Sequence, residues 1–130
     1  MNNQINWINE TKVRFPSLFR DIEPWDFAVG EGWKTIIEAL CRDLDAMHIH
    51  SLRVVQVKEK FGCLRFHVKG ADEQPHVFDR IYQAEVQAAT TCEQCGKPGK
   101  QSQFLLTLCP SCLKQYIREA RDAEEKKGVG

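Results

Sequence analysis

The chain has 130 residues and a mass of 15.0 kDa, the size of one ordinary domain. Hydrophobic residues make up 42% and charged residues 28%, which excludes disordered and fibrous classes of protein. The formal net charge is zero, which argues against a polybasic duplex-binding protein. The longest apolar stretch, residues 104–108, is too short to cross a membrane, and the first residues lack the features of a signal peptide. We therefore expect a soluble protein of the cytoplasm.

The first thirty residues carry only weak patterns. Residues 1–20 show an irregular helical period that Pro16 interrupts, so the sequence predicts a short helix before Pro16 and a turn after it. Residues 21–32 predict a loop. We expect two aromatic residues of this loop, Trp25 and Phe27, to fold back onto the core.

The middle of the chain has clear periodicity. Residues 33–48 place apolar side chains at the spacing of one helical face, with charged residues opposite, and predict a helix that packs on a core. Residues 52–69 change to a period of two and predict a β-hairpin, with a turn over residues 59–62 and with Leu64 and Phe66 on its buried face. Residues 72–90 predict a second helix, with Pro75 in its first turn.

The C-terminal third contains two Cys-x-x-Cys pairs, Cys92 with Cys95 and Cys109 with Cys112. Each pair can direct two thiolates from one tight turn at the same ion, and two pairs complete a tetrahedral set. This spacing predicts one structural Zn²⁺, because four protein thiolates leave no position for a reactive water. The sequence further predicts a strand at residues 104–108, a helix from residue 110 that ends in a charged tail, and a frayed end at residues 128–130.

Other interpretations of the cysteine pairs stay open. Iron suits the same four sulfurs, two disulfides would suit an oxidising compartment, and a redox dithiol would need only one pair. Of the remaining cysteines, Cys41 lies on the apolar face of the helix at 33–48 and is expected in the core. Cys63 follows the hairpin turn and is expected to be exposed. His48 and His50 are interpreted as polar residues at a helix end.

The balanced total charge conceals a basic segment. Residues 51–70 have Glu59 as their single acidic residue, whereas the segments before and after this stretch are acidic. The candidate partner-binding residues of the hairpin are Lys58, Lys60, Phe61, Arg65, His67 and Lys69. Such a face can bind a partner protein, single-stranded nucleic acid or a small ligand, or it can be a solvated strand face that needs polar residues.

Three blocks of the sequence resemble a family of small, mostly uncharacterised proteins of bacteriophages, prophages and bacteria. These blocks are residues 55–66, similar to a "VKEKFGxLRF" pattern, the Gly-x-Gly-Trp segment at 30–33, and the two cysteine segments at 92–99 and 107–112. The chain departs from the family at Cys63, where a second glycine is expected. The resemblance implies a phage-type setting in the host cytoplasm and implies no established activity.

Together these features predict an α+β fold in which helices pack on a short antiparallel hairpin. Residues 1–90 are expected to form the α+β core, and residues 91–127 a zinc module packed on it, similar to a treble clef or zinc ribbon. The favoured function is a non-enzymatic, zinc-stabilised interaction protein, such as a phage accessory or anti-defence factor that binds a host protein complex. The alternatives are a nucleic-acid-binding module that uses the hairpin and the zinc knuckles, and a small enzyme of unknown reaction.

Overall fold

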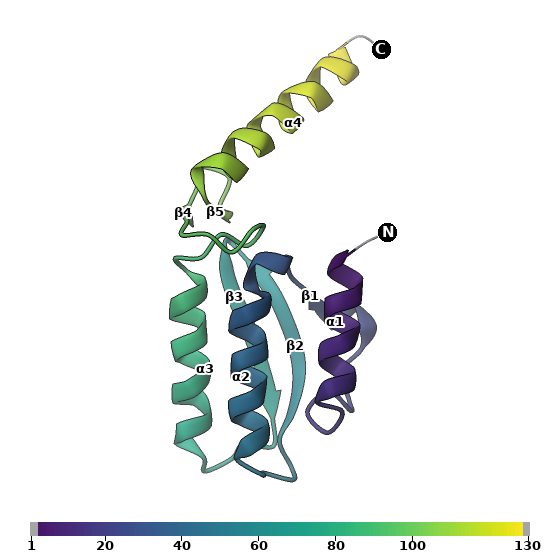
Figure 1. Ribbon diagram of the computed structural model, residues 1–130, viewed down its shortest axis with the longest axis vertical. Helices are drawn as coiled ribbons and strands as arrows, with labels where there is room; N and C mark the ends of the chain where they lie inside the picture. Colours follow the sequence, from purple (N-terminus) through teal and green to yellow (C-terminus); the bar gives the residue numbers. More distant parts are fainter. Residues whose placement is uncertain (1–2, 129–130) are drawn as a thin grey trace.

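Three helices pack on one face of a small sheet, and a cysteine-bearing segment lies at one end of this body (Figure 1). The computed structural model describes residues 3–128. The helices of the body are α1 (Asn3–Arg14), α2 (Lys34–Ala46) and α3 (Pro75–Ala88). We call residues 3–90 the body and residues 91–128 the cysteine module. The arrangement confirms the predicted α+β class.

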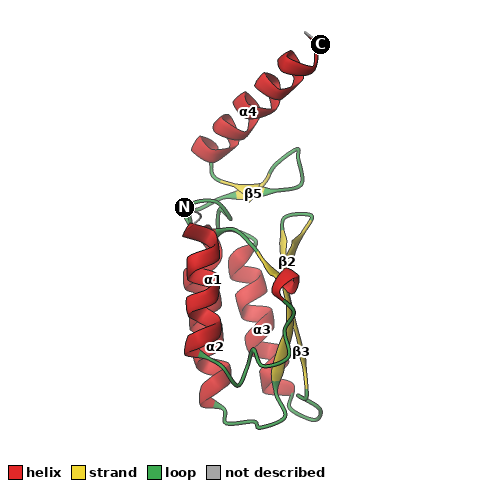
Figure 2. Ribbon diagram, turned by 90° about the vertical axis from the view of Figure 1, so that its right-hand side faces the viewer, coloured by secondary structure: helices red, strands yellow, loops and turns green. Residues whose placement is uncertain are grey.

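The sheet of the body has three strands in the order β1-β2-β3. Strands β2 (Arg53–Lys60) and β3 (Cys63–Lys69) form the predicted antiparallel hairpin. Strand β1 (Phe27–Ala28) pairs with β2 in parallel. The prediction of a plain loop over residues 21–32 is therefore wrong in part, because this segment also contains two short 3-10 helices on either side of β1. Figure 2 shows the helices on one side of the sheet and the other face of the sheet uncovered.

The hairpin closes with a two-residue turn that is tighter than the predicted one. Phe61 and Gly62 both have positive φ, 55° and 82°, the turn geometry that matches the right-handed twist of the two strands. Glu59 and Lys60 belong to β2, and a Glu59 carboxylate oxygen accepts the N–H of Gly62 at 2.7 Å. The tip of the hairpin is thus fixed by its own residues.

One continuous apolar core joins the helices to the sheet. The predicted stripe of α2 is buried, and Leu40 and Cys41 are fully enclosed. The hairpin contributes alternate residues, including Leu64 and Phe66, as predicted. The strand pairing is irregular between Val54 and Gln56. Because of this irregularity, Val54 and Val57 both face the core although they are three positions apart.

The prediction for Trp25 is wrong. Trp25 lies in the 3-10 helix Pro24–Asp26, and 66% of its surface is exposed. Phe27 is buried as predicted, because β1 directs its side chain towards Trp7 and Phe19, with ring centroids 5.6 and 5.4 Å away. Phe27 points inwards because β1 pairs with β2. Trp25 lies before β1 and is not held by this pairing, so its side chain stays exposed.

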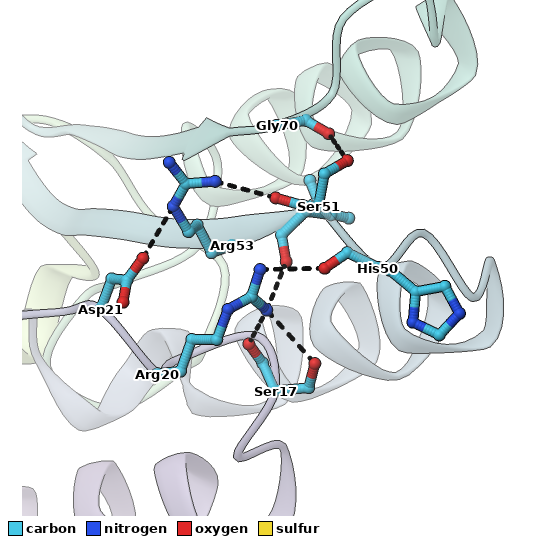
Figure 3. Close-up of polar contacts among 8 residues, drawn as sticks. Ser17, Arg20, Asp21, His50, Ser51, Arg53 and Gly70 are labelled. Carbon is cyan, nitrogen blue, oxygen red and sulfur yellow. Dashed lines mark hydrogen bonds and ion pairs between the residues drawn. The ribbon is translucent and has the colours of Figure 1, made fainter.

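Two arginines tie the segment after α1 to the end of the hairpin that lies far from its turn (Figure 3). Arg20 donates to the backbone oxygens of Ser17 and His50 at 2.6 and 2.9 Å. Arg53 pairs with Asp21 at 2.8 Å. Both guanidinium groups therefore have structural partners within the body.

The cysteine module contains a short hairpin and one long helix. Strands β4 (Lys100–Gln101) and β5 (Thr107–Leu108) pair antiparallel, and α4 (Pro110–Gly128) extends away from the body (Figure 1). The predicted strand at residues 104–108 is mostly wrong, since Leu105 has a φ of 61° within a turn that precedes β5. Of the residues predicted to fray, Gly128 ends α4, and residues 129–130 lie outside the described part of the chain.

Candidate metal centre and basic sheet face

The four cysteines of the two pairs come together in space. Their Sγ atoms all lie within 4.8 Å of one another, and those of Cys95 and Cys109 are 3.6 Å apart. Four thiolates about 2.3 Å from a tetrahedral ion would be separated by about 3.8 Å, close to this distance. A disulfide requires about 2.05 Å, and all six cysteines of the chain are free. The cysteines can therefore hold a metal ion.

Each pair sits on a local structure that presents its sulfurs. In the first pair, Cys92 donates its backbone N–H to Lys97 at 2.7 Å, and Gly96 turns the chain with a φ of 83°. In the second pair, Cys109 precedes α4, and the N–H of Cys112 donates to its sulfur at 3.4 Å. This hydrogen bond is the main reason that the pKa of Cys109 is lowered to about 7. A lowered pKa favours the thiolate, the form that binds metal, at Cys109. Burial and the neighbouring sulfurs raise the pKa of Cys112, and the pKa of Cys95 is raised as well.

The first cysteine pair is attached to the start of α2. The backbone N–H of Gly32 donates to the carbonyl of Glu93 at 2.7 Å, and the Gly30 N–H donates to the Glu93 carboxylate at 2.9 Å. Burial raises the pKa of this carboxyl group, and the hydrogen bond from Gly30 opposes that shift. The indole N–H of Trp33 donates to the Thr91 carbonyl at 2.9 Å. The Gly-x-Gly-Trp segment thus connects the cysteine module to the body.

The close approach of the Gly32 backbone to the backbone of Cys92 explains why position 32 is a glycine. A Cβ atom on Gly32 would lie 2.1 Å from the carbonyl oxygen of Cys92. No side chain fits between these two backbones. The docking of the first cysteine pair therefore depends on glycine at this position.

The module also holds the tip of the hairpin. The hydroxyl of Thr107 donates to the carbonyl of Gly62 at 2.7 Å, and the side-chain amide of Gln101 donates to the carbonyl of Phe61 at 2.7 Å. Thr107 accepts the N–H of Glu93 through its own carbonyl at 3.0 Å. These contacts join the first cysteine pair, β5 and the hairpin turn. Sequence reasoning missed them, because they use backbone carbonyls.

The predicted partner-binding residues gather on the uncovered face of β2 and β3. In the antiparallel register Lys58 lies opposite Arg65, and Lys69 lies opposite Arg53. Residues directly opposite each other point to the same face of a sheet. We call the following set the basic sheet face: Lys58, Lys60, Arg65, His67 and Lys69. Phe61 lies beyond it at the turn, with 57% of its surface exposed and the Lys60 ammonium 5.8 Å from its ring centroid.

The cations of the basic sheet face form no ion pair with an acidic residue among residues 3–128. Arg53 pairs with Asp21, and Arg80 pairs with Asp43, whereas no ion pair within residues 3–128 includes Lys58, Arg65 or Lys69. Like charges directly opposite each other on a sheet are destabilising. No acidic side chain among residues 3–128 offsets the repulsion between Lys58 and Arg65.

Among residues 3–128, the remaining candidate residues form no second metal-binding group. Cys41 is buried in the core, and burial raises the pKa of its thiol. Cys63 is exposed, as predicted, and lies opposite Lys60. Within the described residues, the cysteine quartet is the one group of His, Cys, Asp or Glu side chains arranged to hold a metal, so His48 and His50 take no part in such a group.

No protein-family model, curated protein sequence or solved structure matches the chain. Among residues 3–128, no helix has both the length and the hydropathy that crossing a membrane requires. The function is therefore inferred from the residues themselves and from their geometry.

Proposed function

We propose that this chain is a non-enzymatic, zinc-stabilised interaction protein that binds an acidic partner protein through the basic sheet face. One observation carries the proposal: Lys58 and Arg65 oppose each other across the hairpin, and no acidic side chain of the described residues pairs with either. An arrangement that costs folding stability is consistent with a binding role, because an acidic partner would remove the repulsion.

The cysteine module holds the hairpin turn at the end of the basic sheet face, and a bound metal would stabilise that module. Four thiolates complete the coordination of Zn²⁺ and suit a structural ion that activates no water. The quartet lies in the same module that donates two hydrogen bonds to Phe61 and Gly62 at the hairpin tip. Zinc would thereby keep the end of the basic sheet face in one conformation.

The composition of the face favours a protein over single-stranded nucleic acid. Stacking of successive bases needs aromatic rings along the binding surface. The strand positions of the face carry lysine, arginine and one histidine, and Phe61 lies at the turn, beyond the last strand pair. The likeness of residues 55–66 to phage proteins further supports a host protein complex as the partner and an accessory or anti-defence role.

The test is affinity capture from host cells with three forms of the full chain. The wild type is compared with Lys58→Ala/Lys60→Ala/Arg65→Ala and with Lys114→Ala/Arg118→Ala/Arg121→Ala, a matched loss of three exposed cations on α4. Captured proteins are quantified, with and without nuclease, after circular dichroism has shown that each variant folds.

The proposal expects one protein or complex to be captured by the wild type and by the α4 variant, and to be lost with the hairpin variant. Binding should weaken with added salt, because surface charges are screened. Equal capture by all three forms contradicts the proposal. Loss of the captured material after nuclease treatment, with direct binding to a single-stranded oligonucleotide, would assign the face to nucleic acid instead.

A further inference from the structure

Strand β3 lies at the edge of the three-stranded sheet. It pairs with β2 on one side, and within residues 3–128 no strand pairs with its other side. In a hairpin with a two-residue turn, Lys60 and Cys63 form the hydrogen-bonded pair next to the turn. The backbone groups of Leu64 and Phe66 therefore point away from β2. An exposed strand edge of this kind can accept another strand.

Helix α3 borders this free edge. Its buried residues Val77 and Ile81 face the core, and Arg80 turns towards α2, where it pairs with Asp43 at 2.6 Å. Figure 1 shows α3 at one end of the helical layer, beside α2 and furthest from α1. The flank of α3 opposite Arg80 therefore lies on the outer side, next to the edge of β3.

That flank carries exposed aromatic side chains. Phe78 and Tyr82, one helical turn apart, expose 53% and 66% of their surfaces, and Val86 continues the same row with 51%. A strand added to β3 would direct alternate side chains towards the helical layer, where these residues lie. Its other side chains would point to the uncovered face, beside Arg65 and Lys69.

We propose that an extended segment of the acidic partner binds as an additional strand along the free edge of β3. Residues of this segment alternate between apolar side chains, which pack on Phe78 and Tyr82, and acidic side chains, which pair with Arg65 and Lys69. The inference rests on the proposed function and names the form that its partner takes. Backbone hydrogen bonds supply affinity in this mode, and alternate side chains supply specificity.

The charge of β3 argues against a second copy of this chain as the occupant. Two antiparallel copies of β3 would bring the cations Arg65 and Lys69 of one copy beside those of the other, and like charges across strands repel. The same cations discourage pairing with neutral strands. An acidic strand meets neither obstacle.

The probe is a peptide of alternating glutamate and valine with blocked ends, about eight residues long, the length of an ordinary strand. Its binding to the full, zinc-loaded chain is measured by fluorescence anisotropy, and amide hydrogen exchange is followed by NMR. The backbone N–H groups of Leu64 and Phe66 are expected to become protected on binding. A peptide of identical sequence, methylated on the backbone nitrogens that would face β3, is expected to bind at least about tenfold more weakly.

Two double variants test whether binding depends on the aromatic side chains of α3 in particular or on exposed apolar side chains in general. Phe78→Ala/Tyr82→Ala should weaken binding of the peptide about tenfold or more, because buried aromatic anchors dominate such contacts. Val13→Ala/Trp25→Ala removes two side chains elsewhere on the body, which expose 79% and 66% of their surfaces, and should leave binding unchanged.

Several results would overturn the inference. These are equal binding of the methylated peptide, unchanged exchange at Leu64 and Phe66, no binding of either peptide, or dimers of the free chain that Tyr82→Glu dissociates. If the edge shows none of the expected effects while Lys58→Ala/Lys60→Ala/Arg65→Ala still abolishes capture of the host partner, strand addition fails and the proposed function stands. If that triple variant captures the partner normally, both fail.

Discussion

The body and the cysteine module differ in how much apolar surface they bury. The body buries a continuous apolar core from all three helices and the hairpin, with Trp33, Ile37 and Leu40 fully enclosed. The buried apolar cluster of the module consists of Cys92, Leu108 and Cys109. So small an apolar cluster cannot offset the entropy lost when the module folds, which is why small modules of this kind depend on a metal or a disulfide. Burial of apolar surface therefore stabilises the body, whereas the module buries a much smaller apolar cluster beside four cysteines that can hold a metal ion.

Removal of the metal should have the largest effect on stability, and it should unfold the cysteine module while leaving the body folded. Chelation of zinc removes about 10 kcal/mol or more of binding free energy from the folded module. We expect residues 91–109 to lose protection from hydrogen exchange while the amides of α2 and β2 stay protected. Elemental analysis should find one zinc per chain, and its return should restore the module.

The chelation experiment has two contradicting outcomes. A protein that contains neither zinc nor iron, and whose four cysteines form two disulfides, would contradict the proposed metal centre. Unfolding of the body together with the module would show that the two regions share one cooperative unit.

A core substitution should have the reverse effect. Leu40→Ala removes a fully buried side chain from α2 and should lower the free energy of unfolding of the body by about 2–5 kcal/mol. Urea denaturation measures the loss. Zinc content should stay at one ion per chain under native conditions, because Leu40 lies outside the module. Loss of zinc in the folded variant would contradict the separation of the two regions.

A substitution between the regions should disturb their attachment. In Gly32→Ala the added Cβ meets the carbonyl of Cys92, so the backbones must separate, at a cost of about 1–3 kcal/mol. We expect faster hydrogen exchange at the Glu93 amide and at the hairpin tip, with zinc retained. Thr35→Ala, on the exposed side of the start of α2, is the control. Identical exchange in the two variants would show that the docking does not depend on this glycine.

The smallest effect on stability should come from the basic sheet face. Lys58→Glu converts a like-charged cross-strand pair with Arg65 into an attractive one and should stabilise the chain by about 0.2–1 kcal/mol. The same variant should capture less of the partner. Lys114→Glu on α4 should leave both quantities unchanged. A destabilised Lys58→Glu variant would place Lys58 in a structural role.

Local patterns in the sequence were sufficient for the helices, the hairpin and the cysteine quartet. The apolar period at residues 33–48, the alternation at 63–69 and the two Cys-x-x-Cys steps each depend on residues close together in the chain. Side-chain periodicity reports directly on which face of an element is buried. The basic residues of the hairpin were located in the same way, because their charge contrasts with that of the segments around them.

Tertiary structure alone decided how these pieces meet. The parallel pairing of β1 with β2, which turns Phe27 inwards and leaves Trp25 exposed, joins segments about thirty residues apart. The docking of Glu93 on Gly30 and Gly32, and the position of α3 beside the free edge of β3, likewise depend on contacts between distant segments. Most of these contacts use backbone N–H and C=O groups, which every residue type except proline supplies equally. They leave no periodic pattern of side chains, so folding of the whole chain determines them.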